Sequence, residues 1–319
     1  MLQAPAKQAT RCCRRWRSKA HYFDAKPMSK ARIALASTCA ARKVDEDHAP
    51  LAAALEALDL IVEAPSWDDP QVDWQRYDLV LPRATWNYTN DYPKFLRWLD
   101  QVSGDSWLLN DAATVRWSTN KRYLLDLIAA GLPTVPTSLS VPGELWNAPT
   151  ADEYVVKPAV GAGSRGARRY LARDELAARA HAAALHSEGR ELITQPYLSD
   201  VDTYGETAMV CFEGRFSHAV RKGPLLPLGR NSDPDLFLAE QMSVREASAA
   251  ERALADRVLA WLAPRRPLYA RIDLIRDHAG VPCILELELA EPSLFFSLAP
   301  GSAARLAGAI ERRLRQRRV

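Results

Sequence analysis

The order of apolar and amphipathic segments changes part-way along this chain, and the change predicts two kinds of sheet. Short apolar runs lie at residues 32–36, 60–62 and 77–81. After the first run, Leu51, Leu55 and Leu58 recur at i, i+4 and i+7, which is the spacing of one helix face. Strands that alternate with helices form βαβ units around a parallel sheet. We therefore expect a small parallel-sheet α/β domain over residues 31–118.

Beyond residue 118 the strands come in adjacent pairs, which is typical of antiparallel sheets. The two pairs are residues 206–212 with 215–221, and residues 268–276 with 281–289. A helix over about residues 119–130 precedes them, and Gly131 is expected to end it. Ser243 and Glu246 predict the capping box of a later helix, and residues 223–240 are expected to form a long loop. The fold class is therefore α/β, with the parallel sheet first and antiparallel sheets after it.

Composition and charge exclude several classes of protein. Hydrophobic residues make up 48% of the 319-residue chain and charged residues 25%, which excludes disordered, collagen-like and coiled-coil chains. The formal charge is +3, but residues 1–30 hold eight bases and one acid, so the remainder carries −4. A mildly acidic body predicts no nucleic-acid partner. Because no run approaches the roughly 18 apolar residues of a membrane helix, no membrane partner is expected either.

The N-terminus and the cysteines bear on the compartment of the protein. Residues 1–30 are expected to be a basic disordered extension, because neither an apolar segment nor a cleavage site follows the Arg14-Arg15 pair. A wrongly assigned start codon before Met28 and a basic arm for nucleic acid remain open. The five cysteines include no CxxC pair and predict no disulfide framework. Three of them are expected to be small core residues, and the expected compartment is a reducing cytoplasm.

A glycine-rich loop follows the strand that residues 154–158 predict. Gly161, Gly163 and Gly166 match G-x-G-x-x-G, but a dinucleotide-binding loop opens a helix, whereas residues 167–171 predict a strand. A hairpin entered through Lys157 can fold over a triphosphate, because its backbone N–H groups and the lysine supply positive potential. The alternative is a flexible surface hairpin. Lys157 argues against that alternative, since a lysine that closes a buried strand usually has a partner.

Three carboxylates are expected to meet on the hairpin of residues 268–276 and 281–289. If Asp273 lies opposite Glu286, the antiparallel register places Arg271 opposite Glu288, with all four on one face. The other face is then aliphatic and expected in the core, with Ile272, Leu274, Leu285, Leu287 and Leu289. Opposed carboxylates repel one another, and a divalent cation would neutralise them. The competing interpretation is an Arg271–Glu288 ion pair with Asp273 and Glu286 in solvent.

Six sequence elements resemble the ATP-grasp superfamily and occur in its order. They are Asn120-Lys121 with residues 131–137, residues 155–158 with the glycine loop, residues 195–198, Glu206, residues 271–273 and residues 286–288. Further segments resemble the bacterial group with a glutathione-synthetase-like ATP-binding domain that includes D-cycloserine synthetase: residues 83–88, 216–222 and 286–295. The resemblance implies a two-lobed ATP-grasp after the N-terminal substrate domain. Residues 119–200 would be the lid lobe, and residues 201–319 the metal-binding and catalytic lobe.

The resemblance also implies roles for individual residues. ATP would be bound by Lys121, Lys157, Gly161, Gly163, Gln195, Tyr197, Leu198 and Glu206. Two Mg²⁺ ions would be held by Asp273, Glu286 and Glu288, and Arg271 and Arg221 would face the transferred phosphoryl group. The expected substrate contacts are Arg83, Trp86, Asn87, Lys222 and Ser293. Two positions depart from the superfamily pattern, since Glu288 stands where Asn is usual and Gln195 where Glu is frequent.

These expectations converge on an ATP-dependent carboxylate–amine ligase that acts on a small amino-acid-like substrate. Phosphoryl transfer requires cations placed around spread oxygen charge, which the lysines, arginines and metal ions would supply. The substrate carboxylate would form an acyl phosphate, and an amine would then displace phosphate, within one molecule in a cyclo-ligase of the D-cycloserine synthetase type. The alternatives are an NAD-dependent oxidoreductase that uses the glycine loop and a nucleotide-binding regulatory protein. The identity of the acid and a homodimer are left open.

Overall fold

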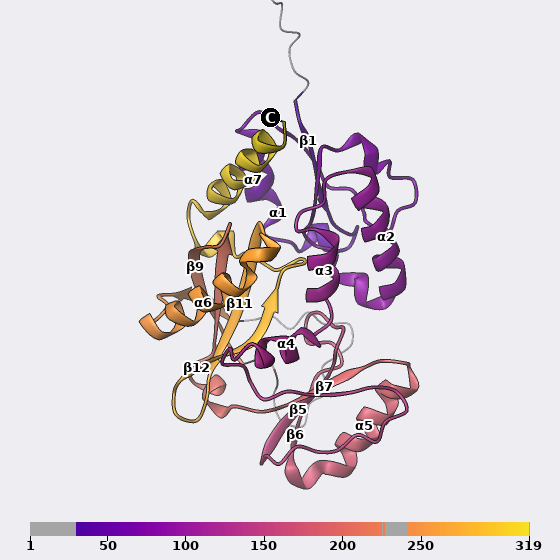
Figure 1. Cartoon of the computed structure of the whole chain (residues 1–319), viewed down its shortest axis with the longest axis vertical. Coiled ribbons are helices and arrows are strands. Elements are labelled where there is room, and N and C mark those ends of the chain that lie inside the picture. The colour runs from indigo at the N-terminus through magenta and orange to yellow at the C-terminus, as the bar shows by residue number, and fades with distance from the viewer. Residues whose placement is uncertain (1–29, 225, 227–240, 319) are drawn as a thin grey trace, which may run out of the picture. The chain divides into compact units, whose positions relative to one another are not determined.

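A computed structural model describes residues 30–224, 226 and 241–318 of the chain. Contacts divide the chain into residues 1–30 and one compact unit, residues 31–319, and the description below concerns that second unit. The expected basic extension and most of the expected loop over residues 223–240 lie outside the described residues. The α/β fold class is confirmed, with one parallel sheet followed by two antiparallel sheets (Figure 1).

The first sheet is parallel and has the order β2-β1-β3. Its strands are β1 (Arg32–Ala36), β2 (Ile61–Glu63) and β3 (Leu79–Pro82). The helices of this region are α1 (His48–Glu56), α2 (Tyr92–Asp105) and α3 (Ala112–Ser118), and the 3₁₀ turns are η1 (Ala41–Lys43), η2 (Trp74–Arg76) and η3 (Trp86–Asn90). Leu51 and Leu55 are buried on α1, whereas Leu58 lies beyond its end. The alternation of apolar runs with amphipathic segments thus predicted the parallel sheet correctly.

The second sheet is antiparallel and has the order β4-β7-β5-β6. Its strands are β4 (Ser138–Ser140), β5 (Glu153–Pro158), β6 (Arg168–Leu171) and β7 (Leu192–Pro196), with α5 (Glu175–Ser187) beside them (Figure 1). The short turns η4 (Ala172–Asp174) and η5 (Ser199–Asp202) follow β6 and β7. The glycine loop joins β5 to β6. It opens a strand rather than a helix, as expected, so it has the wrong context for a dinucleotide-binding fingerprint.

The third sheet is antiparallel and has the order β10-β9-β8-β11-β12. Its strands are β8 (Glu206–Phe212), β9 (Arg215–Lys222), β10 (Met242–Arg245), β11 (Tyr269–Arg276) and β12 (Pro282–Glu288). The remaining helices and turns are α4 (Tyr123–Ala129), α6 (Ala249–Leu262), η6 (Ala263–Arg265), η7 (Phe296–Leu298) and α7 (Ser302–Arg318). Within the described ranges, no helix is long and apolar enough to cross a membrane.

Two helix starts differ from the sequence expectation. The helix expected from residue 119 begins only at Tyr123, because Asn120 Oδ1 accepts from the Arg122 N–H and the Lys121 N–H donates to Ala159 O. The capping box expected at Ser243 and Glu246 is wrong. Ser243 lies in β10, paired with β9, so the chain is still extended there. Ser248 and Glu251 form the capping box of α6 instead.

The β11–β12 register is confirmed where it matters most for the site. Arg271 pairs with Glu288 and Asp273 with Glu286, but a bulge after Asp273 pairs Leu274 with Ile284. Leu285 is therefore the extra residue. The expectation that it lies in the core is wrong, because it is half-buried while Ile284 is fully buried. The loop also covers residues 277–281 instead of the expected 278–281.

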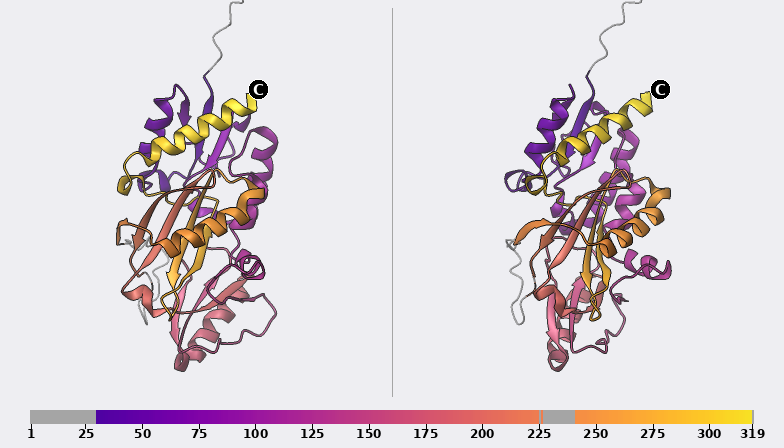
Figure 2. Two further views of the ribbon diagram at one scale, coloured as in Figure 1. Left: turned by 60° about the vertical axis from the view of Figure 1, so that its left-hand side comes forward. Right: turned by 90° about the vertical axis from the view of Figure 1, so that its left-hand side faces the viewer.

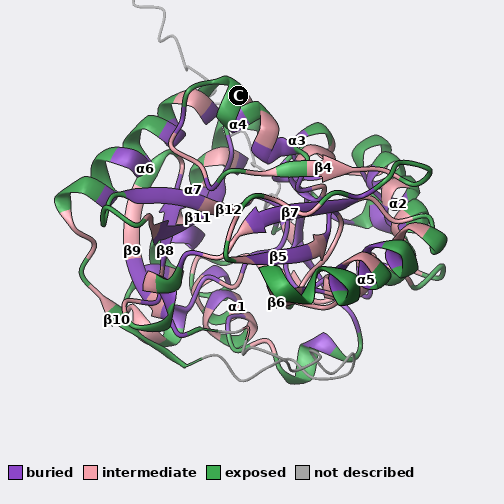
Figure 3. Cartoon of the chain, turned by 90° about the horizontal axis from the view of Figure 1, so that it is seen from below, coloured by how far each residue is buried: buried purple, intermediate pink, exposed green. Residues whose placement is uncertain are grey.

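One core joins the N-terminal sheet to the third sheet. Ile33 and Leu35 of β1 belong to the same buried cluster as Val210 of β8 and Ile310 of α7. α7 packs along α1, which Figure 2 shows from the side. In Figure 3 the strands β5, β7 and β8 are buried along most of their length. Cys211 and Cys283 are buried as expected, but Cys39 is exposed, so the expectation of a third core cysteine is wrong.

Candidate active site

A cavity of about 470 Å³ lies among the three sheets. Its walls come from the η1–α1 connection, η3, the glycine loop, the ends of β5 and β7, and the β8, β9, β11 and β12 strands. The expected site residues that line it are Trp86, Lys121, Lys157, Gly161, Gly163, Gln195, Tyr197, Leu198, Glu206, Lys222, Arg271, Glu286, Glu288 and Ser293. Residues from distant parts of the sequence therefore meet in one space.

One part of the cavity wall is apolar. It is formed in part by Val155 of β5, Leu198 after β7, Val201 of η5, Ile275 of β11 and Leu285 of β12. Leu285 reaches this wall because the bulge turns it out of the core. Gln195 is buried beside these residues, and its Nε2 donates to Thr137 Oγ1 over 2.9 Å. Such a wall suits a flat aromatic ring.

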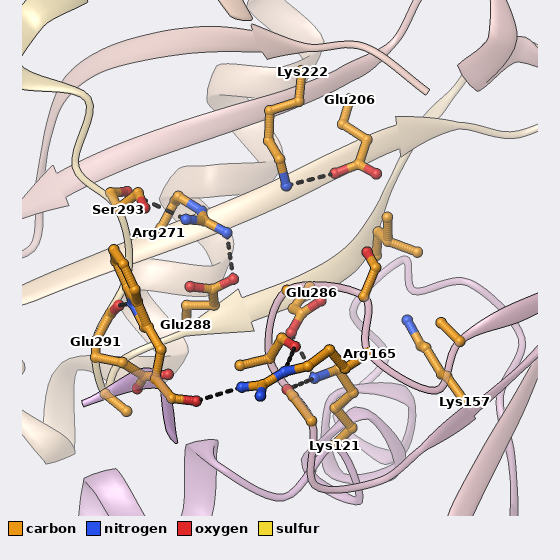
Figure 4. Close-up of a pocket in the computed structure, with 18 of the residues that line it drawn as sticks. Lys121, Lys157, Arg165, Glu206, Lys222, Arg271, Glu286, Glu288, Glu291 and Ser293 are labelled. Atoms are coloured by element: carbon orange, nitrogen blue, oxygen red, sulfur yellow. Dashed lines mark hydrogen bonds and ion pairs between the residues drawn. The ribbon is translucent and has the colours of Figure 1, made fainter. Parts of the chain in front are cut away.

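Two lysines line the cavity next to the glycine loop. Lys121 Nζ donates to Gly161 O at 2.9 Å and pairs with Glu286 at 2.9 Å. Lys157 stands at the end of β5, where burial lowers its pKa and Lys121 and Lys222 add repulsion. Its ammonium group points into the cavity (Figure 4) and has no ion pair or hydrogen bond within the described part of the chain. Lys157 therefore has no direct partner among the described residues, although the nearby Glu286 and Glu206 partly offset its burial.

The carboxylates of the hairpin are paired with cations. Asp273 is 1% exposed, and its oxygens accept from Arg271 at 2.8 and 2.9 Å and from Lys222 at 3.2 Å. Burial opposes ionisation of Asp273, but Arg271 and Lys222 outweigh it and hold its pKa below the usual value. Arg271 also pairs with Glu288. The competing interpretation is thus half right, since the Arg271–Glu288 pair exists but Asp273 is not in solvent.

Glu286 and Glu288 differ in their electrostatic surroundings. Burial opposes ionisation of Glu286, yet Lys121 and Lys157 hold its pKa below the usual value. Burial raises the pKa of Glu288 to about 7, because Arg271 does not offset burial and the neighbouring carboxylates. Glu286 is therefore ionised at neutral pH, whereas Glu288 titrates close to it.

The donor set fits Mg²⁺ only in part. Glu286 and Glu288 line the cavity and offer carboxylate oxygens, the ligand type that Mg²⁺ prefers. Asp273 is not part of the cavity wall, and Arg271 and Lys222 already occupy its oxygens. In the ranges that the structure describes, no group of three His, Cys, Asp or Glu side chains is arranged to hold a metal ion. A metal ion would thus meet two glutamates first.

Three further expected residues do not line the cavity. Arg83 is 2% exposed and donates to Pro292 O at 3.0 Å, with Asp47 at 3.7 Å. Asn87 bonds to Asp68 and Trp67, and Arg221 donates to the carbonyls of residues 203 and 204. These three side chains hold loops in place.

The structure adds residues that were not in the expected set of site residues. Arg165 of the glycine loop donates to Trp86 O at 2.8 Å, which ties the loop to η3 (Figure 4). Tyr88 and Glu291 also line the cavity and are buried. Each lay inside a segment already quoted for its resemblance or its glycine pattern. Nothing in the local sequence distinguished these side chains from their neighbours.

Comparison with known proteins now identifies the family. The family described as "D-cycloserine synthetase DcsG, N-terminal domain" matches residues 33–110. The cycloserine biosynthesis protein DcsG of Streptomyces lavendulae is 36% identical over 298 residues, which cover 89% of this chain and 99% of that protein. The chain belongs to the DcsG family. The resemblance read from the sequence is confirmed.

Solved structures support the same family and fold. The crystal structure of D-cycloserine synthetase DcsG has a TM-score of 0.81 and 33% identity, covering 89% of this chain and 100% of that one. D-alanine–D-alanine ligase from Bacillus anthracis has a TM-score of 0.65 and 15% identity, covering 91% and 98%. The second likeness shows the ATP-grasp fold alone. As a member of the DcsG family, this chain is an ATP-dependent ligase, and neither the oxidoreductase nor the regulatory alternative holds.

Proposed function

We propose that this ligase activates the carboxylate of a small amino-acid-like substrate and closes a ring within that molecule. Its relatives are named as a cycloserine biosynthesis protein and a D-cycloserine synthetase, which supports a product of this kind. The observation that carries the proposal is the cavity, which places Lys121, Lys157 and Arg271 around Glu286 and Glu288. Cations around a shared space are what phosphoryl transfer requires. A cavity of about 470 Å³ suits small-molecule ligands.

ATP would lie with its adenine on the apolar wall of Leu198, Ile275 and Leu285. Glu206, at the start of β8, would accept hydrogen bonds from the ribose hydroxyls, and Lys157 would neutralise phosphate charge. Glu286 and Glu288 would hold the Mg²⁺ ions, which neutralise charge on the phosphate oxygens when bound. Asp273 would join them as a ligand only if Arg271 and Lys222 released its oxygens.

The reaction would proceed in two steps. An oxygen of the substrate carboxylate attacks the γ-phosphorus, the bond to the bridging oxygen breaks, and ADP leaves an acyl phosphate behind. A nitrogen of the same substrate then attacks the acyl carbon and inorganic phosphate leaves, so a C–N bond replaces the C–O bond. Arg271 would stabilise the negative charge on the transferred group. The glycine loop, tied to η3 by Arg165, would exclude water from the acyl phosphate.

The proposal is tested by ADP release with defined substrates. O-ureido-D-serine, which carries both a carboxylate and an internal nitrogen nucleophile, is expected to release ADP when supplied alone with ATP and Mg²⁺. A single cyclic product and one phosphate per turnover should accompany it. ADP release that requires two separate amino acids, such as two D-alanine molecules, would show an intermolecular ligase instead.

A further inference from the structure

Two buried polar side chains in the cavity lack a partner. Glu291 is 8% exposed and Tyr88 is 3% exposed, and both line the cavity. Within the described residues, neither the Glu291 carboxyl group nor the Tyr88 hydroxyl group has a hydrogen bond or an ion pair. Buried polar groups in folded proteins are normally hydrogen-bonded. The oxygen atoms of this pair are not among the fully enclosed unpartnered atoms of the described residues, so they are accessible from the cavity and a ligand with hydrogen-bond donors would satisfy them.

The cations nearest to Glu291 are already engaged. Lys121, Arg271 and Arg83 all lie close enough to favour its ionised form. Their partners are Gly161 and Glu286 for Lys121, Asp273 and Glu288 for Arg271, and Pro292 and Asp47 for Arg83. None of these three cations forms a hydrogen bond or an ion pair with Glu291 among the described residues, although Arg83 Nη1 is buried without a hydrogen-bond partner.

Burial disfavours the charged form of Glu291, and a cation bound directly to its carboxyl group would restore that form. Burial raises the pKa of Glu291 to about 8, and the negative charge of Glu288 adds to that effect. Burial also raises the pKa of Tyr88 well above its usual value, so its hydroxyl stays neutral and can accept a hydrogen bond. A ligand that brought positive charge and several N–H donors would satisfy both side chains at once.

The position of Glu291 is fixed by its backbone. Trp86 Nε1 donates to Glu291 O at 3.3 Å, and this contact joins the segment after β12 to η3 (Figure 4). Tyr88 belongs to the same η3 turn. The two unpartnered groups therefore come from segments that are hydrogen-bonded to each other, and Glu291 lies close enough to Tyr88 to help raise the pKa of its hydroxyl group.

We propose that Glu291 and Tyr88 bind the ammonium group of the substrate, so that the enzyme selects an amino acid with a free, protonated amine over the matching acid without one. The inference rests on the proposed ligase function and specifies the substrate class of that site. An ammonium group has three N–H donors, which the Glu291 carboxylate and the Tyr88 hydroxyl oxygen can share.

The test compares two probes that differ only in the amine, O-ureido-D-serine and 3-ureidooxypropanoate. Their Kd values for the full chain are measured by calorimetry, in parallel with the Kd of ATP–Mg²⁺. The wild-type protein should bind the amine-bearing probe about 10–100-fold more tightly, the ratio expected for a charge-assisted hydrogen bond. Glu291→Gln should reduce that ratio to within about threefold and leave ATP–Mg²⁺ binding within twofold. Glu56→Gln makes the same chemical change on the exposed end of α1 and should keep the full ratio.

Several outcomes would overturn the inference. Equal affinity of the wild-type protein for the two probes would exclude an ammonium site, even if ADP release showed the ligase function to be correct. A Glu291→Gln protein that loses ATP–Mg²⁺ affinity but keeps the probe ratio would make Glu291 a metal ligand instead. Tyr88→Phe is the second variant, used if Glu291→Gln does not fold, and an unchanged probe ratio in it would equally contradict the proposal.

Discussion

The position of Lys157 in the fold indicates what this residue binds. A lysine that ends a buried strand and lacks a partner in the described part of the chain pays a desolvation cost, which appears as its lowered pKa. A bound triphosphate would remove that cost. Lys157→Ala should therefore weaken ATP binding about tenfold to a hundredfold, the effect of one charge-assisted contact, and leave the melting temperature nearly unchanged.

Calorimetric titration with ATP–Mg²⁺ measures the Lys157 effect. Lys43→Ala is the matched control, because Lys43 is an exposed lysine of η1 that does not line the cavity. ATP affinity that falls equally in both variants would point to general loss of positive charge. Unchanged affinity in Lys157→Ala would remove this lysine from the nucleotide site.

Glu291 makes the stability of the ligand-free protein depend on pH. Its pKa is about 8 in the folded chain against a usual value of 4.5, so the unfolded chain gives up this proton first as pH rises. Stability from this group is therefore fully present below about pH 4.5 and is lost as pH rises through about 8. The free energy of unfolding of Glu291→Gln, relative to wild type, should increase between pH 5 and pH 8. Urea titrations at several pH values test this, and a pH-independent difference would contradict it.

Residue types and spacing predicted most of the cavity, but not its unpartnered groups. Lys121, Glu286 and Glu288 were found because they lie in segments that resemble the superfamily's motifs, and Lys157 also because it lies at the end of a buried strand. Whether a carboxylate such as Glu291 keeps a partner depends on where cations from distant segments point. No local pattern carries that information.

At the scale of elements, the start of α6 separates two interpretations of the sequence. The Ser248 side chain accepts from the Glu251 N–H, and Glu251 is 1% exposed and accepts from Thr207 Oγ1 at 2.7 Å. Ser248→Ala should therefore lower the free energy of unfolding by about 1 kcal/mol, the usual cost of losing an N-cap. Ser243→Ala, on exposed β10, should change it by less than about 0.5 kcal/mol. Urea denaturation of both variants measures these changes. A larger loss of unfolding free energy in Ser243→Ala than in Ser248→Ala would support the capping box that was expected at Ser243.

Strands were predicted well where apolar and polar residues alternate regularly. They were predicted poorly where hydrogen-bond pairing with the neighbouring strand determines which residues lie opposite each other. The β11–β12 register follows from matching charged residues as far as Asp273, after which the bulge shifts it by one. The residues around the bulge, Leu274 and Leu285, are aliphatic on both sides of the shift. Local sequence therefore gave no sign that Leu285 would leave the core for the cavity wall.

On the scale of the whole chain, the N-terminal sheet and the third sheet behave as one folded unit. They share a buried cluster, and Asn110 joins them by hydrogen bonds. Asn110 Nδ2 donates to Tyr269 O at 3.0 Å and to Leu289 O at 2.7 Å, and its Oδ1 accepts from the Leu268 N–H at 2.6 Å. The division into domains, which followed the strand pattern and the resemblance, contained no hint of this hydrogen-bonded link, because it depends on one amide with 1% exposure.

Asn110→Ala should therefore destabilise the whole unit and not the N-terminal sheet alone. It leaves the Leu268 N–H without its acceptor and two buried carbonyls without their donor, and one such group costs about 1–3 kcal/mol. A loss of about 3 kcal/mol or more is expected in urea denaturation, with tryptophan fluorescence and far-UV circular dichroism still changing together. Asn147→Ala, at an exposed asparagine, is the control and should be near neutral. A shared core allows neither sheet to lose its buried face while the other keeps it, so the wild-type protein should unfold in a single transition. Two separate transitions would show instead that the sheets unfold independently.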